Sequence, residues 1–493
     1  MSTESSIASA GCASADPVAI SKAPTGIAGL DEVLLGGVPR GRATLVGGGP
    51  GTGKTNLGLE FLYRGALADE PGILLTFEEP AESIRGNART MGWDLETLEK
   101  QGKLIVLDAH LPSDTVATGE FDIGGVLAIL GGHIRALGAR RVVIDAADLL
   151  LRLFSDRRRQ EDQLITLHDW LRGQQQTVII TVKTTNDPAE PMHRLEYMTD
   201  CVLRLDHRVL GQVSTRRLRV LKYRGSAFLS NEYPYVIGSR GIVLMPVSSL
   251  ELTARAAGSR FSTGVPGLDS LYGGGPFHGS SILIGGGSGT GKTLIGCSIA
   301  AAASARGEHV LYVSFEESVA SLTRSVRSAG IDVEAPVQAG RLTFLTSIPE
   351  SMGVEEHLWR IYECIDHVEP RHVVVDAISA CQRMGSEAAA FDFLVRLLTH
   401  CKGRGATCIY LNQTDPRHSV EQLTGVGISS LIDSLIVLRQ DWPSHTEHGR
   451  EMLVVKVRGS QHSHEWNPFR ITDAGVVFGG RTTLLRKSDA ADD

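Results

Sequence analysis

The 493-residue sequence lacks the signals of a secreted or membrane-bound chain. Its first residues have neither a basic start nor a long apolar core, so we expect no signal peptide. No apolar run reaches about 18 residues, so no membrane-spanning helix is predicted. The seven cysteines are scattered and none forms C-x-x-C, which argues against a disulfide framework or a zinc site. These features indicate reduced thiols in a cytoplasmic protein.

The chain also has fewer basic than acidic residues. The formal net charge is −7, with 49 Lys and Arg against 56 Asp and Glu, and the pI is about 6.2. An acidic chain argues against a protein that binds nucleic acid mainly by electrostatics. The basic cluster Arg157–Arg159 has no interleaved aromatic residues, so we interpret it as a solvated helix start or a subunit contact. The sixteen histidines show no metal-ligand spacing.

The sequence does contain a phosphate-binding pattern, written twice. Gly48–Thr55 reads G-G-P-G-T-G-K-T and Gly286–Thr293 reads G-G-S-G-T-G-K-T. Both fit the P-loop G-x-x-x-x-G-K-[ST], follow a strand-like run and precede a helical pattern. Glycines let backbone N–H groups approach a triphosphate, the lysine reaches the outer phosphates, and the final hydroxyl can ligate Mg²⁺. The predicted ATP-binding residues are Gly48, Gly49, Gly51, Thr52, Gly53, Lys54, Thr55, Gly286, Gly287, Gly289, Thr290, Gly291, Lys292 and Thr293, with Thr55 and Thr293 as metal ligands.

Other landmarks repeat with the P-loop, which indicates duplication of one unit. T-G-x-x-G-L-D begins at Thr25 and again at Thr263, with the same separation as the two P-loops. We predict a disordered tail over 1–20, a first ATPase domain over 21–247, a linker over 248–260, a second domain over 261–482 and a tail over 483–493.

Each copy alternates strand-like and helical runs, which predicts an α/β fold. In the first copy we expect strands around 43–47, 73–77, 104–107, 141–145 and 177–182, and helices around 55–67, 81–91 and 160–173. Such alternation is typical of a mostly parallel sheet flanked by helices, with its ligand at the carboxyl ends of the strands.

Carboxylates follow the strand-like runs of both copies. Glu78–Glu79 and Glu316–Glu317 should emerge where the phosphates bind and polarise an attacking water or hydroxyl. Mutual repulsion should raise the proton affinity of one member of each pair. A solvated strand end is the alternative, but recurrence beside a second P-loop favours catalytic roles for all four. Asp145 and Asp376 each close an apolar strand, which predicts Walker B residues near the Mg²⁺ water shell.

A pair of cations recurs near the end of each copy. Lys222 and Arg224, like Lys456 and Arg458, alternate along a strand-like run and should share one face. They either protect an exposed sheet edge by charge or reach ATP held by a neighbouring subunit, as arginine fingers do. Recurrence favours the second interpretation.

Together these motifs resemble the KaiC family, tandem RecA-like P-loop ATPases best known from the cyanobacterial circadian clock. The resemblance covers Thr25 to about Gly480 and includes the doubled T-G-x-x-G-L-D, G-x-G-T-G-K-T, F-E-E, V-[VI]-D and K-x-R-G-S. It implies a homohexameric double ring with ATP and Mg²⁺ at subunit interfaces, a slow ATPase in the first copy, an autokinase and autophosphatase in the second, and a KaiB-like or signalling partner.

The same resemblance assigns roles by motif match. Glu78 matches the catalytic glutamate, Thr90 lies where the family has a hydroxyl near the nucleotide, and Glu316 matches a catalytic and metal-binding glutamate. The segments that match ATP contacts across the interface are Lys222, Tyr223, Arg224 and Ser226 in the first copy and Lys456, Val457 and Arg458 in the second. Ser429 and Ser430 match the adjacent phosphoacceptors.

Two other functions share the P-loop core. One is a RecA/RadA-like motor on DNA, which should show DNA-stimulated turnover and a basic surface. The other is an ATP-gated scaffold that recruits partners without phosphoryl transfer. The acidic pI and the second F-E-E favour an ATPase and autokinase of the KaiC type over the DNA motor.

Overall fold

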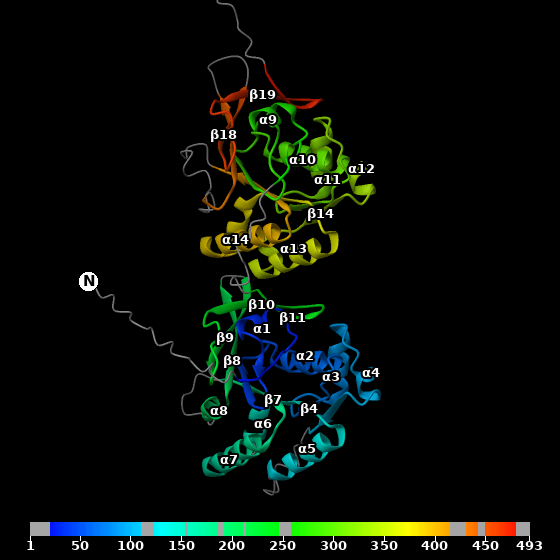
Figure 1. The fold of residues 1–493 in the computed structure, drawn as a ribbon, viewed down its shortest axis with the longest axis vertical. Coiled ribbons are helices and arrows are strands. Elements are labelled where there is room, and N and C mark those ends of the chain that lie inside the picture. Colours follow the sequence, from blue (N-terminus) through cyan, green and yellow to red (C-terminus); the bar gives the residue numbers. More distant parts are fainter. Residues whose placement is uncertain are drawn as a thin grey trace, which may run out of the picture. The chain divides into compact units, whose positions relative to one another are not determined.

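The computed structural model describes residues 20–109, 123–152, 156–184, 192–210, 213–245, 258–414, 430–441 and 449–479. The chain divides into two compact units, with the main boundary after Pro246. Figure 1 shows that each unit is a sheet flanked by helices. The predicted tails and linker fall largely outside the described residues, so their limits stay predictions.

The first unit is built on a nine-stranded sheet in the order β11-β10-β9-β8-β3-β7-β6-β4-β5. Neighbours from β8 to β5 run parallel, whereas β9, β10 and β11 pair antiparallel with one another. The strands are β3 (Ala43–Gly48), β4 (Gly72–Thr76), β5 (Leu104–Asp108), β6 (Arg141–Asp145), β7 (Thr177–Lys183), β8 (Cys201–Leu210), β9 (Val213–Tyr223), β10 (Glu232–Gly238) and β11 (Gly241–Leu244); β1 (Lys22–Ala23) and β2 (Val38–Pro39) form a separate pair.

The second unit repeats this order as β14-β13-β15-β16-β12-β17-β18-β19-β20. Its strands are β12 (Ser281–Gly286), β13 (Val310–Ser314), β14 (Leu342–Thr346), β15 (His372–Asp376), β16 (Thr407–Gln413), β17 (Ser434–Asp441), β18 (Gly449–Val457), β19 (Asn467–Thr472) and β20 (Gly475–Phe478). The identical order confirms the prediction of two tandem, mostly parallel P-loop folds.

Helices cover both faces of each sheet. The first unit has α1 (Leu30–Val33), α2 (Lys54–Leu67), α3 (Ala81–Thr90), α4 (Leu95–Lys100), α5 (Ile123–Leu137), α6 (Ala147–Arg152), α7 (Arg157–Gly173) and α8 (Met192–Met198). The second has α9 (Pro266–Leu271), α10 (Lys292–Ala305), α11 (Val319–Arg327), α12 (Glu334–Gln338), α13 (Val354–Val368), α14 (Glu387–Gly403) and the 3₁₀ helices η3 (Pro349–Ser351) and η4 (Ile378–Met384). In Figure 1, α5 lies beside α7, and α13 beside α14.

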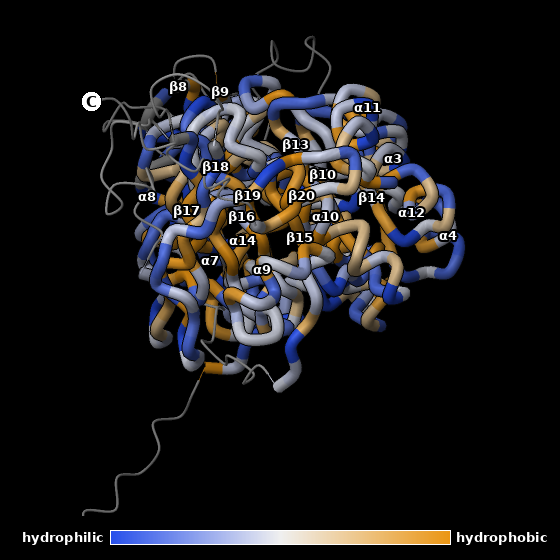
Figure 2. The backbone as a smooth tube through the Cα atoms, turned by 90° about the horizontal axis from the view of Figure 1, so that it is seen from above, coloured by the Kyte–Doolittle hydropathy of each residue, from blue (hydrophilic) through white to orange (hydrophobic). Residues whose placement is uncertain are grey.

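Strand residues alternate between two cores because successive side chains point to opposite faces of the sheet. Leu74 and Val143 pack into the core with α2 residues such as Phe61, whereas Ile73 and Val142 pack into the core on the other face. Burial on both faces explains why these strands read as continuous apolar runs. The central strands β13, β15 and β16 of the second unit are correspondingly orange in Figure 2.

The repeated T-G-x-x-G-L-D motif has a structural role. Asp31 accepts hydrogen bonds from the Thr25 backbone N–H and hydroxyl, both at 2.7 Å, and Asp269 does the same for Thr263 at 2.9 and 2.6 Å. Each aspartate therefore fixes the chain before a P-loop domain begins its central strand.

Two composition-based expectations can also be compared with the structure. All six cysteines among the described residues are free thiols. Within that same part of the chain, no helix combines the length and apolarity needed to cross a bilayer.

Arg157 begins α7, with Asp156 as its N-cap, which confirms a helix start at the basic cluster.

Candidate nucleotide-binding sites

Both P-loops leave the carboxyl end of the central strand of their sheet. The first connects β3 to α2 and the second connects β12 to α10. Each helix is preceded by a glycine with positive φ, 82° at Gly53 and 102° at Gly291, which glycine adopts without steric cost. The Thr52 and Thr290 hydroxyls close the loops by donating to the Gly49 and Gly287 carbonyls, each at 2.9 Å.

The P-loop lysines point back over their own loops. Lys54 Nζ donates to the Gly49 carbonyl at 2.9 Å, and Lys292 Nζ donates to the Gly286 and Gly287 carbonyls at 2.9 and 2.8 Å. Burial lowers the pKa of both ammonium groups, while the nearby Walker carboxylates oppose this shift. A bound phosphate group would be an anionic partner for each ammonium group and would compensate for its burial.

The first Walker pair, Thr55 and Asp145, is in hydrogen-bond contact. Thr55 Oγ1 donates to Asp145 Oδ2 at 3.0 Å, and Thr181 Oγ1 donates to Asp145 Oδ1 at 2.5 Å. Asp145 is 1% exposed, and its burial raises the pKa of the carboxyl although both hydroxyls lower it. Hydroxyl and carboxylate oxygens are the ligands that Mg²⁺ prefers, so these residues fit a magnesium–nucleotide site.

The second Walker pair is held differently. The Thr293 hydroxyl bonds Asp376, as in the first unit, but the other donor is Tyr312 Oη at 2.7 Å. Burial again raises the pKa of Asp376. Sequence reasoning missed both Thr181 and Tyr312. Their signal was a polar residue inside an otherwise apolar strand, which becomes informative only once the neighbouring strands are known.

The two glutamates of each acidic pair occupy different environments. Glu78 and Glu316 are exposed, whereas Glu79 accepts from Asn87 Nδ2 at 2.9 Å and Glu317 accepts from Ser321 Oγ at 3.1 Å. The second glutamate is thus anchored to the following helix, and the first is free to face the nucleotide site. Electrostatic repulsion adds to burial in raising one pKa of each pair, that of Glu79 in the first unit and of Glu316 in the second.

Two arginines that sequence reasoning missed contact the P-loops directly. Arg216 Nε on β9 donates to the Gly51 carbonyl, and Arg450 Nε on β18 donates to the Gly289 carbonyl, both at 3.2 Å. They occupy corresponding places in the two units. The first lies in the arginine-rich S-T-R-R-L-R, but only the strand order places it at the P-loop.

The predicted Lys–Arg pairs lie at the opposite end of the central strands, beside the residues where β3 and β12 begin. The Arg224 backbone N–H bonds the Asp200 carbonyl, and the Asp200 N–H bonds the carbonyl of Ala43, the first residue of β3. In the second unit the Arg458 backbone N–H donates to the Asp433 carbonyl, and the Asp433 backbone N–H donates to the carbonyl of Ser281, the first residue of β12. Each P-loop leaves the far end of that six-residue strand, roughly 17 Å away at about 3.3 Å per residue.

The cations are held in place by main-chain carbonyls. Lys222 and Arg224 both donate to the Tyr197 carbonyl, at 3.2 and 2.5 Å, and Lys456 donates to the Ile432 carbonyl at 2.8 Å. Arg224 and Arg458 are exposed. The arginines of both pairs are therefore accessible and lie at the end of the sheet away from the P-loop of their own unit.

Other residues predicted to contact ATP are placed as follows. Tyr223 is 5% exposed with its hydroxyl donating to Gly37 at 2.9 Å, and Val457 is 8% exposed in the second core. Ser226 is half-buried and donates to the Ala227 carbonyl, while exposed Thr90 closes α3 by donating to the Asn87 carbonyl. Their nucleotide contacts stay predictions.

Of the two predicted phosphoacceptors, Ser429 lies outside the described residues. Ser430 is exposed, and its backbone carbonyl accepts a hydrogen bond from Arg458. The apolar run after it forms β17. Ser430 therefore lies at the same end of the sheet as the Lys–Arg pair, away from the P-loop of its own unit.

Comparisons with known proteins agree with this geometry. The sequence model of the family "ATPase: KaiC" matches residues 23–249 and 261–483. The circadian clock protein KaiC2 of Synechocystis sp. (strain ATCC 27184 / PCC 6803 / Kazusa) is 35% identical over 92% of this chain and 81% of its own length. The circadian clock oscillator protein KaiC of Synechococcus elongatus (strain ATCC 33912 / PCC 7942 / FACHB-805) is 35% identical over 93% of this chain and 89% of its own length. With two P-loop folds, paired Walker residues and both repeats matched, the chain belongs to the KaiC family of ATPases.

Proposed function

We propose that this KaiC-family ATPase binds Mg²⁺–ATP in both units, hydrolyses it, and phosphorylates itself on Ser429 or Ser430. Bound Mg²⁺–ATP supplies the transferable phosphoryl group and the charge neutralisation that its transfer needs. Lys54 and Lys292 bind the phosphates of the first and second unit; Thr55 would hold the metal in the first unit, and Thr293 and Glu316 would hold it in the second. Exposed Glu78 and Glu316 orient and deprotonate the attacking water or hydroxyl.

The observation that carries the proposal is the separation between each P-loop and the Lys–Arg pair of the same unit. A lysine or arginine side chain cannot cross a six-residue strand, so these cations do not reach a nucleotide held by their own unit, and we propose that they contact one held by another subunit. Ser430 lies at the same end of the sheet as Arg458, which supports it as the acceptor for that neighbouring nucleotide. We therefore propose a head-to-tail homohexamer with ATP at each interface and phosphoryl transfer between subunits.

The biological role is proposed from the relatives. They are named circadian clock proteins, which supports a signalling or timing regulator whose phosphorylation state is read by a KaiB-like or other signalling protein. The acidic composition supports a protein partner over nucleic acid.

Phosphosite mapping tests the kinase. After incubation with ATP and Mg²⁺, mass spectrometry should find phosphate on Ser429 or Ser430, and Glu316→Gln should abolish it while ATP binding remains. An assembled, ATP-loaded protein without phosphate on either serine would leave an ATPase scaffold. Turnover that rises severalfold with added DNA would instead support the RecA-like motor.

A mixing experiment tests transfer between subunits. Lys292→Ala chains should lack a functional second nucleotide site, and chains with both serines changed to alanine should lack acceptors. Neither variant alone should become phosphorylated, but co-assembled hexamers should carry phosphate on the Lys292→Ala chains. Absence of phosphate in mixed hexamers, with normal labelling of the wild type, would contradict transfer between subunits.

A further inference from the structure

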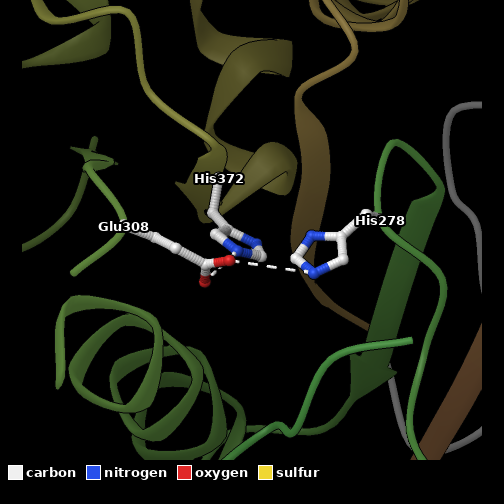
Figure 3. A group of neighbouring side chains, drawn as sticks. All are labelled: His278, Glu308 and His372. Atoms are coloured by element: carbon white, nitrogen blue, oxygen red, sulfur yellow. Dashed lines mark hydrogen bonds and ion pairs between the residues drawn. The ribbon is translucent and has the colours of Figure 1, made fainter. Parts of the chain in front are cut away.

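Three side chains of the second unit converge at the start of its sheet, far from the P-loop. His372 is the first residue of β15, Glu308 precedes β13 and His278 precedes β12. Figure 3 shows both imidazole rings turned toward the Glu308 carboxylate. His372 Nε2 lies 3.0 Å from Glu308 Oε2, and His278 Nε2 lies 3.7 Å from Glu308 Oε1.

Packing fixes these three side chains in place. The His372 side chain is 0% exposed, and those of His278 and Glu308 are 15% and 20% exposed. Phe261 contacts both imidazoles, with ring centroids 5.1 Å from His278 and 4.7 Å from His372. The potential ligand atoms already lie within 4.8 Å of one another.

The first unit has different chemistry at the same three positions. Arg40 lies three residues before the central strand, Glu70 two residues before β4, and Arg141 at the first residue of β6. There the two arginines bind Glu70 directly, Arg40 Nη1 at 2.7 Å and Arg141 Nε at 2.7 Å. In the first unit the two arginines neutralise the charge of Glu70. An arginine side chain cannot ligate a metal, whereas an imidazole can.

We propose that His278, Glu308 and His372 form a binding site for a borderline transition-metal ion, best filled by Zn²⁺. Two imidazole nitrogens, one carboxylate oxygen and a water would complete a tetrahedron. Ligands about 2.1 Å from Zn²⁺ lie about 3.4 Å apart, so ligand atoms that lie within 4.8 Å of one another need to close by at most about 1.4 Å. Mg²⁺ and Ca²⁺ prefer oxygen ligands and are not expected here.

The protonation state supports the proposal. Burial lowers the pKa of His372 to about 4 and also lowers that of His278, so both rings are neutral at pH 7. Neutral imidazole is the form that binds metals, once the proton that His372 Nε2 donates to Glu308 has moved to Nδ1. Burial raises the pKa of the Glu308 carboxyl, but hydrogen bonds from His372 and Arg306 and the charge of Arg306 lower it overall, so it is ionised.

Two features limit the affinity. Arg306 already donates to Glu308 Oε2 at 3.1 and 2.8 Å, so a metal must share or displace this cation. Neither His278 Nδ1 nor His372 Nδ1 has a hydrogen-bond partner among the described residues, and an oriented second shell normally strengthens metal binding 10–100-fold. We therefore expect binding weaker than that of a closed structural zinc site.

A cavity borders the site at His278. It has a volume of about 600 Å³ and is lined there by Phe277, His278, Gly279 and Ser280. The basic residues Arg371, Lys402, Arg404 and Arg458 also line it, which slows cation entry. Because β15 separates His372 from Asp376, the proposed site is distinct from the P-loop of its own unit, and metal binding can be tested without the proposed phosphoryl transfer.

Metal binding can be measured on the full chain without any assay of activity. After chelator treatment and dialysis, calorimetric titration with Zn²⁺ should give one ion per chain, and Co²⁺ should give the visible absorption bands of a tetrahedral complex. The double variant His278→Arg with His372→Arg introduces the two arginines of the first unit in place of the imidazole ligands, so it should lose that ion. If it does not fold, His278→Ala, outside the sheet, tests the same loss.

Two further variants sharpen the test. Arg306→Gln removes the competing cation and should bind Zn²⁺ severalfold more tightly. His464→Ala, at the other close histidine pair, should leave binding unchanged. No Zn²⁺ uptake by the wild type, uptake that survives both His278 variants, weaker uptake by Arg306→Gln, or loss in His464→Ala would each overturn the proposal.

Discussion

At the scale of single residues, the two units place the same buried carboxylate with different donors. Asp145 accepts from Thr181 on the neighbouring strand β7, and Asp376 accepts from Tyr312 on the neighbouring strand β13. A buried carboxylate without such donors is costly. The two copies have therefore met one requirement independently.

Removing either donor should destabilise only its own unit. Thr181→Val and Tyr312→Phe keep side-chain size but leave the Walker aspartate short of one hydrogen bond, at a cost of about 1–3 kcal/mol. Differential scanning calorimetry should show a lower transition for the unit that carries the change. Equal transitions in wild type and variants would show that the donors contribute no net stability.

Two matched substitutions test which unit dominates ATP hydrolysis. Glu78→Gln keeps size and removes the base, so steady-state ATP turnover should fall about 10²-fold or more if the first unit dominates hydrolysis. Nucleotide binding, measured with a fluorescent ATP analogue, should persist. Intact turnover in Glu78→Gln together with its loss in Glu316→Gln would reverse the assignment of the dominant unit.

At the scale of elements, the P-loop depends on its terminal glycine. Gly53→Ala would strain a φ of 82° and place Cβ 2.6 Å from Ile237 Cδ1, so we expect a loss of about 1–2 kcal/mol in stability and loss of ATP binding in the first unit. Gly49→Ala is the matched control, because its Cβ meets nothing within 4 Å. It should melt like the wild type; equal destabilisation by both would contradict this account.

Elements were predicted better than their contacts. The expected strands 141–145 and 177–182 appear as Arg141–Asp145 and Thr177–Lys183, because apolar runs between turn residues specify buried strands locally. The contacts of Arg216 with Gly51 and of Tyr312 with Asp376 depend on strand order, which no local pattern encodes. The histidine cluster was missed for the same reason, since His278, Glu308 and His372 are far apart in sequence.

At the scale of the whole molecule, assembly should require nucleotide. With ATP and Mg²⁺ the protein should sediment as a hexamer, and Arg224→Ala or Arg458→Ala should weaken assembly or turnover without unfolding the chain. Both arginines are exposed, so their removal costs little stability. A monomer at saturating ATP in analytical ultracentrifugation would exclude the interface role.

In the proposed hexamer, the separation of the P-loop and the Lys–Arg pair to opposite ends of the sheet would give each subunit two different interface surfaces. An interface formed in this way joins unlike surfaces, so two subunits cannot satisfy each other symmetrically, and only a closed ring leaves no site incomplete. One defective subunit then damages only the site it completes for its neighbour. When Arg458→Ala chains are mixed into wild-type rings, activity should therefore decline in proportion to the variant fraction. A much steeper loss would indicate that all sites of a ring act in concert.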